Sequence, residues 1–265
     1  MSSLLILLFG CMWAVATGFS MLGQGGGALY TPIQVLFGIE FHQAATTSLF
    51  LIMMTSLSAT LVFRKARRVD WPLALGLESV TALGALVGGL TSGGFSGVVL
   101  SQVFAGVVGF AALFMVRDFR GASGAPHPVA GPFRWQRRLG AQRYSIDLRI
   151  ALPASFAAGL ASGLVGVGGG ILKVPLMVLL LGIPMQVAVG SSAFMVGLTA
   201  AGGFAGHVVS GHWDWKTSAI LAVAVVIGAQ LGARASIGVD PDKLKKAFGG
   251  FLLAVAALMA ARAWW

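Results

Sequence analysis

Charged residues are scarce in this sequence. Only 10% of its 265 residues are Asp, Glu, Lys or Arg, whereas 57% are hydrophobic and the mean hydropathy is +0.88. Soluble domains carry about 25% charged residues, so this composition excludes a water-soluble globular protein. No charged residue precedes Glu40 and none lies between Glu40 and Arg64. Because each interval exceeds the roughly 20 apolar residues that a membrane helix needs, we expect an all-α polytopic membrane protein.

Cysteine is nearly absent, and nucleotide-binding motifs are missing. The single cysteine, Cys11, excludes an internal disulfide and a cysteine metal cluster. A P-loop is excluded because Leu172, and not glycine, precedes Lys173. We expect no metal, no cofactor and no catalytic residue. Because no ATP-binding motif is present, any energy-requiring step must draw on a gradient or on a partner. The N-terminal apolar run lacks the basic start of a signal peptide, and we expect it to remain as the first helix.

Acidic residues are the rarer of the two charge types. Eight Asp and Glu stand against 18 Lys and Arg, which gives a net charge of +10 at pH 7. Four of the basic residues lie in 64–68 and seven in 117–149, so two short segments hold 11 of the 18. The positive-inside rule places such clusters in cytoplasmic loops. We therefore predict a cytoplasmic location for both segments and expect no nucleic-acid partner.

Glycine, in contrast, is abundant, with 38 residues. The run Gly-Gln-Gly-Gly-Gly at 23–27 recurs as Gly-Val-Gly-Gly-Gly at 166–170, and a proline follows each run five residues later. Glycine costs about 1 kcal/mol in a helix interior, so each run should break a membrane helix. The sequence thus predicts two broken helices in corresponding places.

The match between the two copies extends well beyond the glycine runs. An offset of 143 residues, and of 144 after one insertion, aligns further pairs: Ala44 with Ala188, Thr47-Ser48 with Ser191-Ser192, and Asp70-Trp71 with Asp214-Trp215. The chain is therefore one unit written twice. We divide it into a first transmembrane repeat at 1–117, a basic linker at 118–149 and a second repeat at 150–265. The three prolines of the linker predict little fixed structure.

The basic residues change sides between the two copies. In copy one they lie at 64–68, after the helix expected at about 42–63. In copy two they flank the next loop, at 234–246. This pattern is typical of inverted-topology repeats, which require an odd number of crossings per half. We expect about 8 to 10 membrane segments in total, and the short piece after each glycine run either spans or re-enters the membrane.

Paired helix breaks are the best sequence pointer to the binding site of a transporter. An opened helix end exposes N–H groups and partial positive charge, so we predict an anion site. The hydroxyls of the aligned motifs are further candidates. In the alternative, the glycines only let helices touch, as expected for Gly84-x-x-x-Gly88 and Gly228-x-x-x-Gly232. The candidate substrate-binding residues are Gly25, Gly26, Gly27, Thr47, Ser48, Gly168, Gly169, Gly170, Lys173, Ser191 and Ser192.

Two isolated charges fall within apolar segments. Lys173 lies three residues past the second break, and a buried lysine requires a counter-charge, for which the substrate is a candidate. If Lys173 lies near an interface, its side chain can instead snorkel to water. Glu78 is the candidate for a coupling proton, although it would equally fit the headgroup region.

These features together resemble a known family. The paired G-x-G-G-G segments with their prolines, the following Ala and Thr/Ser-Ser, and the repeated Asp-Trp make the chain similar to the TauE/SafE sulfite exporter family. The resemblance implies a secondary transporter that moves small sulfur-containing anions, such as sulfite or sulfonates like sulfoacetate, across the bacterial plasma membrane. Its expected partners are a small anion and the lipid bilayer, and a homodimer is possible.

Two further hypotheses concern the location of the site and the class of protein. In inverted halves, the break of one copy should lie at the depth of the hydroxyl motif of the other, which predicts a site shared by the two copies. The main rival class is an intramembrane serine protease, because Gly94-Phe95-Ser96-Gly97 fits the G-x-S-G pattern with Ser96 as nucleophile. A passive anion channel is the other alternative.

Overall fold

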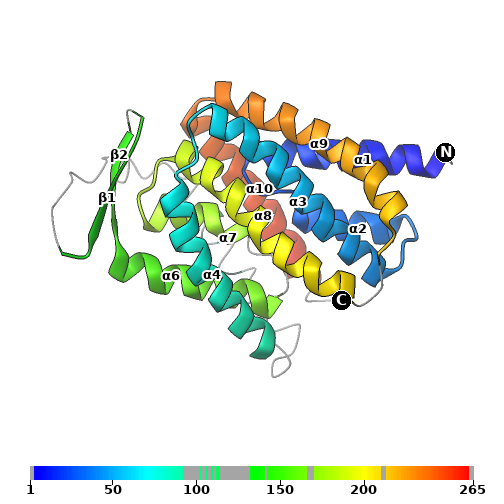
Figure 1. Cartoon of the computed structure of the whole chain (residues 1–265), viewed down its shortest axis with the longest axis horizontal. Helices are drawn as coiled ribbons and strands as arrows, with labels where there is room; N and C mark the ends of the chain where they lie inside the picture. Colours follow the sequence, from blue (N-terminus) through cyan, green and yellow to red (C-terminus); the bar gives the residue numbers. More distant parts are fainter. Residues whose placement is uncertain are drawn as a thin grey trace. The chain divides into compact units, whose positions relative to one another are not determined.

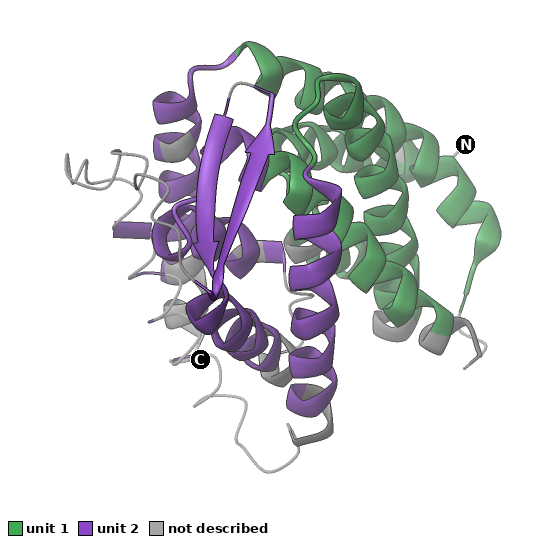
Figure 2. Cartoon of the chain, turned by 60° about the vertical axis from the view of Figure 1, so that its left-hand side comes forward, with its two compact units in different colours: residues 1–69, 189–238 green, residues 70–188, 239–265 purple. Residues whose placement is uncertain are grey.

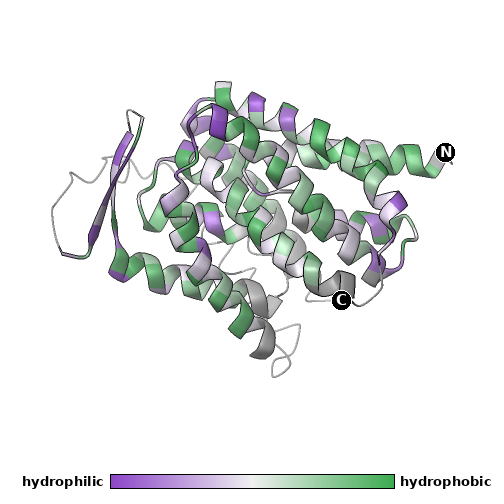
Figure 3. Cartoon of the chain, in the orientation of Figure 1, coloured by the Kyte–Doolittle hydropathy of each residue, from purple (hydrophilic) through white to green (hydrophobic). Residues whose placement is uncertain are grey.

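The computed structural model describes residues 3–91, 102, 106, 109, 112–113, 132–140, 142–165, 170–209 and 213–262. Within these ranges the chain is helical apart from one two-stranded hairpin (Figure 1). The helices are mainly hydrophobic and the hairpin is largely hydrophilic (Figure 3). Five described helices are long and apolar enough to cross a membrane, which confirms the all-α polytopic class. These spans are Leu4–Met21, Gln43–Lys65, Trp71–Gly88, Met185–Ala205 and Trp215–Gly238.

The helices follow the same order in the two copies. Copy one contains α1 (Ser3–Met21), α2 (Gly27–Leu36), α3 (Phe41–Lys65) and α4 (Trp71–Thr91). Copy two contains α6 (Leu148–Val165), α7 (Gly170–Pro175), the π-helical turn η2 (Leu176–Leu180), α8 (Met185–Val209), α9 (Trp215–Gly238) and α10 (Pro241–Arg262). Each copy therefore has a long helix, a glycine-rich interruption, a short helix and further long helices.

The short helix after the first glycine run cannot cross a bilayer by itself. With 10 residues, α2 is about 15 Å long, about half of a typical hydrocarbon core. A glycine with positive φ follows the short helical segment in each copy, Gly38 at 83° and Gly182 at 63°. These glycines hold aligned positions in the repeat, so the same left-handed turn reverses the chain twice.

The described chain forms two compact units, and each draws on both sequence copies (Figure 2). Unit 1 comprises residues 1–69 and 189–238, and unit 2 comprises 70–188 and 239–265. Unit 1 thus combines α1, α2 and α3 with most of α8 and with α9. A repeat in the sequence and a compact unit in space are different divisions of the chain, and the repeat boundaries at 117 and 150 stay a prediction.

In unit 1, α1 packs directly on α9 through glycines. A Cβ atom on Gly228 would lie 2.5 Å from the carbonyl oxygen of Trp13, and one on Gly232 would clash with the carbonyl of Thr17. Only glycine allows the two backbones to approach so closely. This confirms the expectation that the Gly228-x-x-x-Gly232 pair serves helix contact.

The same contact recurs in unit 2 between α4 and α6. A Cβ atom on Gly84 would clash with the carbonyl of Phe156, and one on Gly159 would clash with the carbonyl of Thr81. Gly84 aligns with Gly228 in the repeat, and Phe156 aligns with Trp13. The two copies therefore preserve a helix pair as well as a sequence pattern.

The repeated Asp-Trp motif marks the beginning of a helix in each copy. Asp70 accepts a hydrogen bond from the backbone N–H of Leu73 (3.2 Å) at the start of α4. Asp214 accepts from the N–H groups of Lys216 (3.0 Å) and Thr217 (3.3 Å) at the start of α9. The Thr217 hydroxyl also donates to Asp214, which lowers the pKa of that carboxyl. The aspartates are N-caps, which explains why the motif recurs.

The linker contains a hairpin that the sequence did not predict. Strands β1 (Arg134–Leu139) and β2 (Gln142–Asp147) pair antiparallel, and Gly140 adopts a positive φ of 59° at the turn. The expectation of little fixed structure across 118–149 was therefore wrong for this part of the linker. The reason is the contact of the hairpin with Asp70.

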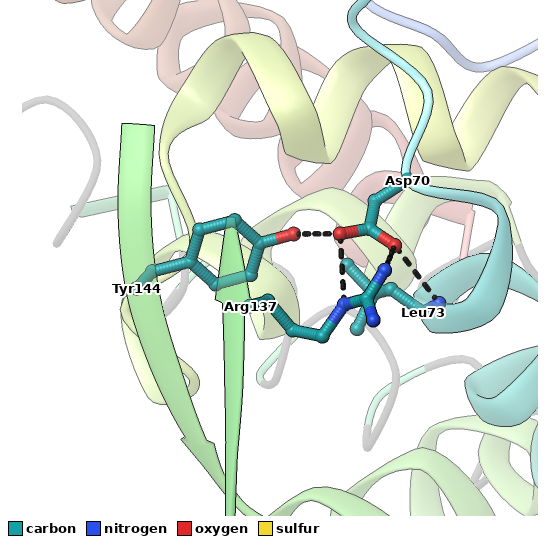
Figure 4. A network of polar contacts seen from close by, with 4 residues as sticks. All are labelled: Asp70, Leu73, Arg137 and Tyr144. Carbon is teal, nitrogen blue, oxygen red and sulfur yellow. Dashed lines mark hydrogen bonds and ion pairs between the residues drawn. The ribbon is translucent and has the colours of Figure 1, made fainter. Parts of the chain in front are cut away.

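The hairpin is anchored on Asp70 by two side chains from directly paired positions (Figure 4). Arg137 donates from two nitrogens to the two carboxylate oxygens of Asp70 (3.1 and 2.6 Å), and the Tyr144 hydroxyl donates to Oδ2 (2.6 Å). The Asp70 side chain is fully buried. The hydrogen bond to Asp70 raises the pKa of Arg137. Burial raises the pKa of Tyr144, and the hydrogen bond of Tyr144 to Asp70 raises it further. A two-pronged ion pair thus fixes the hairpin at the start of α4.

Candidate functional site

The first glycine run forms an open turn between α1 and α2 in unit 1. Gly23, Gly25 and Gly26 all have positive φ, between 68° and 83°. Side chains rarely adopt this conformation, so the chain path itself requires glycine at these positions. Between them, the Gln24 N–H donates to the carbonyl of Phe19 (3.0 Å), which ends α1. The predicted break is therefore a defined turn and α2 begins immediately after it.

The turn packs on α8 and α3. A Cβ atom on Gly23 would clash with the carbonyl of Val189, and one on Gly25 would lie 2.8 Å from Ser56 Oγ and 3.0 Å from Val196 Cγ1. Ser192 follows Val189 by three residues and precedes Val196 by four, so it lies on the same face of α8. The break of copy one thus packs on the helix that carries the hydroxyl motif of copy two, which is compatible with the shared-site hypothesis. The converse pairing involves residues 166–169, which lie outside the described residues.

Several buried polar atoms around this turn lack a hydrogen-bond partner within the described chain. Both amide atoms of Gln24 are unpaired, and so are the hydroxyls of three serines near it. Gln24 is 3% exposed, and the serines are Ser20, Ser56 and Ser192, each at most 1% exposed. Native structures rarely leave such groups unpaired, because each costs about 1 to 3 kcal/mol. Their concentration at a helix break points to a polar ligand.

The repeat pattern predicted Ser192 as a site residue but not Gln24, Ser20 or Ser56. Gln24 is the one polar side chain within the glycine runs, and its counterpart in copy two is the apolar Val167. That asymmetry was the available signal. Ser56 and Ser20 carried none, because serine is common in membrane helices and bonds back to its own helix.

The other predicted hydroxyls have partners within unit 1. Ser218 Oγ donates to Thr47 Oγ1 (3.1 Å), and Gln34 Nε2 donates to Ser48 Oγ (2.8 Å). Ser191 is fully buried and also has an interaction partner. Thr47 thus joins α3 to α9, and Ser48 joins α3 to α2. Of the predicted glycines, Gly27 begins α2 and Gly170 begins α7, whereas Gly168 and Gly169 lie outside the described residues.

The two isolated charges meet in unit 2. Lys173 Nζ on α7 lies 2.7 Å from Glu78 Oε2 on α4, and the two side chains are 2% and 1% exposed. The counter-charge of Lys173 is therefore a protein carboxylate, which corrects the suggestion that the substrate supplies it. Such deep burial also excludes the snorkelling alternative for Lys173, whereas the depth of Glu78 in the bilayer stays a prediction. The ion pair belongs to unit 2, whereas the turn at Gln24 belongs to unit 1.

Comparison with known proteins decides the family. The family model described as Sulfite exporter TauE/SafE matches residues 7–259. The chain belongs to the sulfite exporter TauE/SafE family. A probable membrane transporter protein of Xylella fastidiosa (strain 9a5c) is 28% identical over 270 residues, covering 98% of this chain and 96% of the relative. No solved structure matches the chain.

Two further TauE/SafE relatives bear similar names. The probable membrane transporter protein YunE of Bacillus subtilis (strain 168) is 28% identical over 257 residues and covers 88% of each chain. A probable membrane transporter protein of Haemophilus influenzae (strain ATCC 51907 / DSM 11121 / KW20 / Rd) is 26% identical over 282 residues and covers 97% of each chain. Together with the apolar helices, these matches identify a multi-pass membrane transporter. The protease candidate Ser96 lies outside the described residues.

Proposed function

We propose that this TauE/SafE protein is a secondary transporter that moves small sulfur-containing oxyanions across the bacterial plasma membrane. Sulfite and sulfonates such as sulfoacetate are the proposed substrates, and no enzymatic step is involved. The observation that carries the proposal is the group of unpaired polar atoms at the first helix break. The matched family is described by sulfite export, which supports a sulfur oxyanion as the ligand of these atoms.

The chemistry of the turn favours an oxyanion over a cation or an apolar molecule. The Gln24 amide supplies two N–H donors, and each serine supplies one O–H donor. The N-terminus of α2, whose N-cap is Gly26, adds partial positive charge two residues away. Among the described residues of unit 1, no charged side chain is buried. Binding at this turn would therefore rest on hydrogen bonds and the helix dipole, which suit the several acceptor oxygens of a sulfur oxyanion.

The proposed mechanism is alternating access of two inverted halves. The recurring helix order and the recurring glycine contact support a duplicated architecture. The shift of basic residues between the copies supports their inversion, with the linker on the cytoplasmic side. A glycine turn at a helix break provides backbone that can rearrange between outward-open and inward-open states.

The proposal can be tested by counterflow of radiolabelled sulfite in proteoliposomes. Ser56→Ala and Ser192→Ala should weaken saturable uptake, since each removes a hydroxyl assigned to the substrate. Ser58→Ala is the matched control, because the Ser58 hydroxyl already donates to the carbonyl of Val226 (3.0 Å). It should keep the substrate affinity of the wild type. Equal effects of all three changes, or uptake that does not saturate, would contradict the proposal, and the second result would indicate a channel.

A further inference from the structure

The ion pair between Lys173 and Glu78 is costly to place where it lies. Moving a charge into a bilayer interior costs at least about 2.5 kcal/mol, and a buried ion pair often stabilises a protein no better than apolar side chains of similar volume. Both partners are almost fully buried at 2.7 Å. Stability alone therefore does not explain why the chain places an ion pair at these positions.

The repeat provides an internal comparison for this pair. Lys173 aligns with Tyr30, and Glu78 aligns with Ala222. Tyr30 belongs to the buried apolar cluster of unit 1, and Ala222 packs against that cluster. The Tyr30 hydroxyl is hydrogen-bonded to Thr55 (2.9 Å), and no charge is needed. The corresponding helices of unit 1, α2 of copy one and α9 of copy two, thus carry neutral residues at these positions, so the architecture does not require an ion pair there.

The helices that carry the pair and their neighbours α6 and η2 contain little further charge. Among the described residues of α4, α6, α7 and η2, the only further charged side chain is Arg149, which is exposed and stacks on Phe133. The hairpin contributes Arg137, which is bound to Asp70 eight residues before Glu78. Eight helical residues correspond to about 12 Å along the axis of α4. Among the described residues of these helices, Lys173 is therefore the cation that pairs with the Glu78 carboxylate.

We propose that Glu78 and Lys173 are the proton-coupling element of the transport cycle, an inference that rests on the proposed function. A proton binds the Glu78 carboxylate and breaks the ion pair, while Lys173 keeps its ammonium charge. The interior then carries one net positive charge, which balances a bound monovalent anion. When the anion leaves, Glu78 releases the proton on the same side and the ion pair forms again. One proton thus accompanies each anion, and the transfer is electrically neutral.

The test compares counterflow with accumulation driven by a pH gradient, both with radiolabelled sulfite, and follows proton uptake with an internal pH-sensitive dye. Glu78→Gln mimics the protonated state, so counterflow should persist while pH-driven accumulation and the dye signal are lost. Glu40→Gln is the matched control, because Glu40 is an exposed N-cap of α3. It should leave both readouts at the wild-type level.

A second variant covers the case in which Glu78→Gln does not fold. The double change Glu78→Ala with Lys173→Tyr installs the neutral residues of the aligned positions in unit 1, Ala222 and Tyr30, and it should fold and lose proton coupling. Accumulation by either folded variant at the wild-type level would overturn the inference. Wild-type counterflow without proton uptake would overturn this inference alone, whereas no wild-type counterflow with any sulfur anion would overturn the proposed function as well.

Discussion

The glycine contact between α1 and α9 gives a sharp prediction for stability. Gly228→Ala would place a Cβ atom 2.5 Å from the carbonyl oxygen of Trp13 and 3.0 Å from Thr17 Oγ1. An ordinary carbon–oxygen contact is about 3.3 Å, so the overlap is about 0.8 Å. The carbonyl belongs to a helix backbone and cannot rotate away, which means that the helices must separate.

The size of the effect follows from two opposing terms. Overpacking of a tight core costs about 1 to 3 kcal/mol, while replacing glycine by alanine in a helix returns about 1 kcal/mol. The expected net loss for Gly228→Ala is therefore up to about 2 kcal/mol. Gly202→Ala on α8 is the matched control, because no atom lies within 4 Å of its Cβ position. It should gain about 0.5 to 1 kcal/mol.

The assay is thermal unfolding of the purified protein in detergent. A separation of about 0.5 to 3 kcal/mol between the two variants corresponds to roughly 1 to 12 °C in Tm for a chain of this size. Gly84→Ala should behave like Gly228→Ala, since Gly84 faces the equivalent carbonyl of Phe156 in unit 2. Equal Tm values for Gly228→Ala and Gly202→Ala would refute the reasoning.

Two further predictions concern the hairpin. Arg137→Met leaves the buried Asp70 carboxylate without its cation. Because Arg137 is about one-fifth exposed, water screens part of the ion pair, and we expect the hairpin to lose about 1 to 3 kcal/mol of stability. The loss should be seen as faster hydrogen exchange of residues 134–147. Unchanged exchange would mean that the ion pair does not hold the hairpin. The pKa of Tyr144 is raised above its ordinary value near 10, so its contribution is complete below pH 10 and is lost as the pH rises further. Protease cleavage of the hairpin should therefore increase above pH 10 in the wild type, whereas Tyr144→Phe should show no such step.

Much of the architecture could be predicted from the sequence, because a membrane imposes simple rules on a chain. The scarcity of charge identified the helical membrane class, and the offset of 143 to 144 residues identified the duplication. The Gly228-x-x-x-Gly232 pair predicted a close helix contact, which unit 1 contains. These features depend on local pattern, and local pattern is what a sequence displays.

The hairpin and the intertwining of the copies could not be predicted in the same way. The anchor of the hairpin, Asp70, lies 67 residues before Arg137, and the apolar alternation of the strands is short, with Arg137 standing between Trp135 and Leu139. Membrane helices are apolar on most faces, so α1 carries no stripe that selects α9 as its partner. The partner of a helix in a bilayer is decided by small residues and shape, which act across long sequence separations.

The candidate site was foreseen in part. Ser192 and the glycines came from the repeat, whereas the importance of Gln24 became visible only when its buried amide was found without a partner. Lys173 and Glu78 were each singled out as isolated charges, but their pairing joins α7 to α4 and follows from the fold alone. A sequence shows which residues are unusual, and the structure shows which of them meet.

Binding of the substrate by Gln24 at the first helix break can be tested with the variant Gln24→Met. This change keeps the size of the side chain and removes an amide that is buried without a partner, so the protein should be as stable as the wild type or more stable. Gln230→Met is the matched control, since Gln230 lies at the surface of α9 and binds Arg234 (3.0 Å). The account predicts that Gln24→Met loses saturable sulfite counterflow while its Tm is unchanged or raised, and that Gln230→Met keeps the counterflow. Normal counterflow in Gln24→Met, or a fall in its Tm that accounts for the lost transport, would contradict the claim.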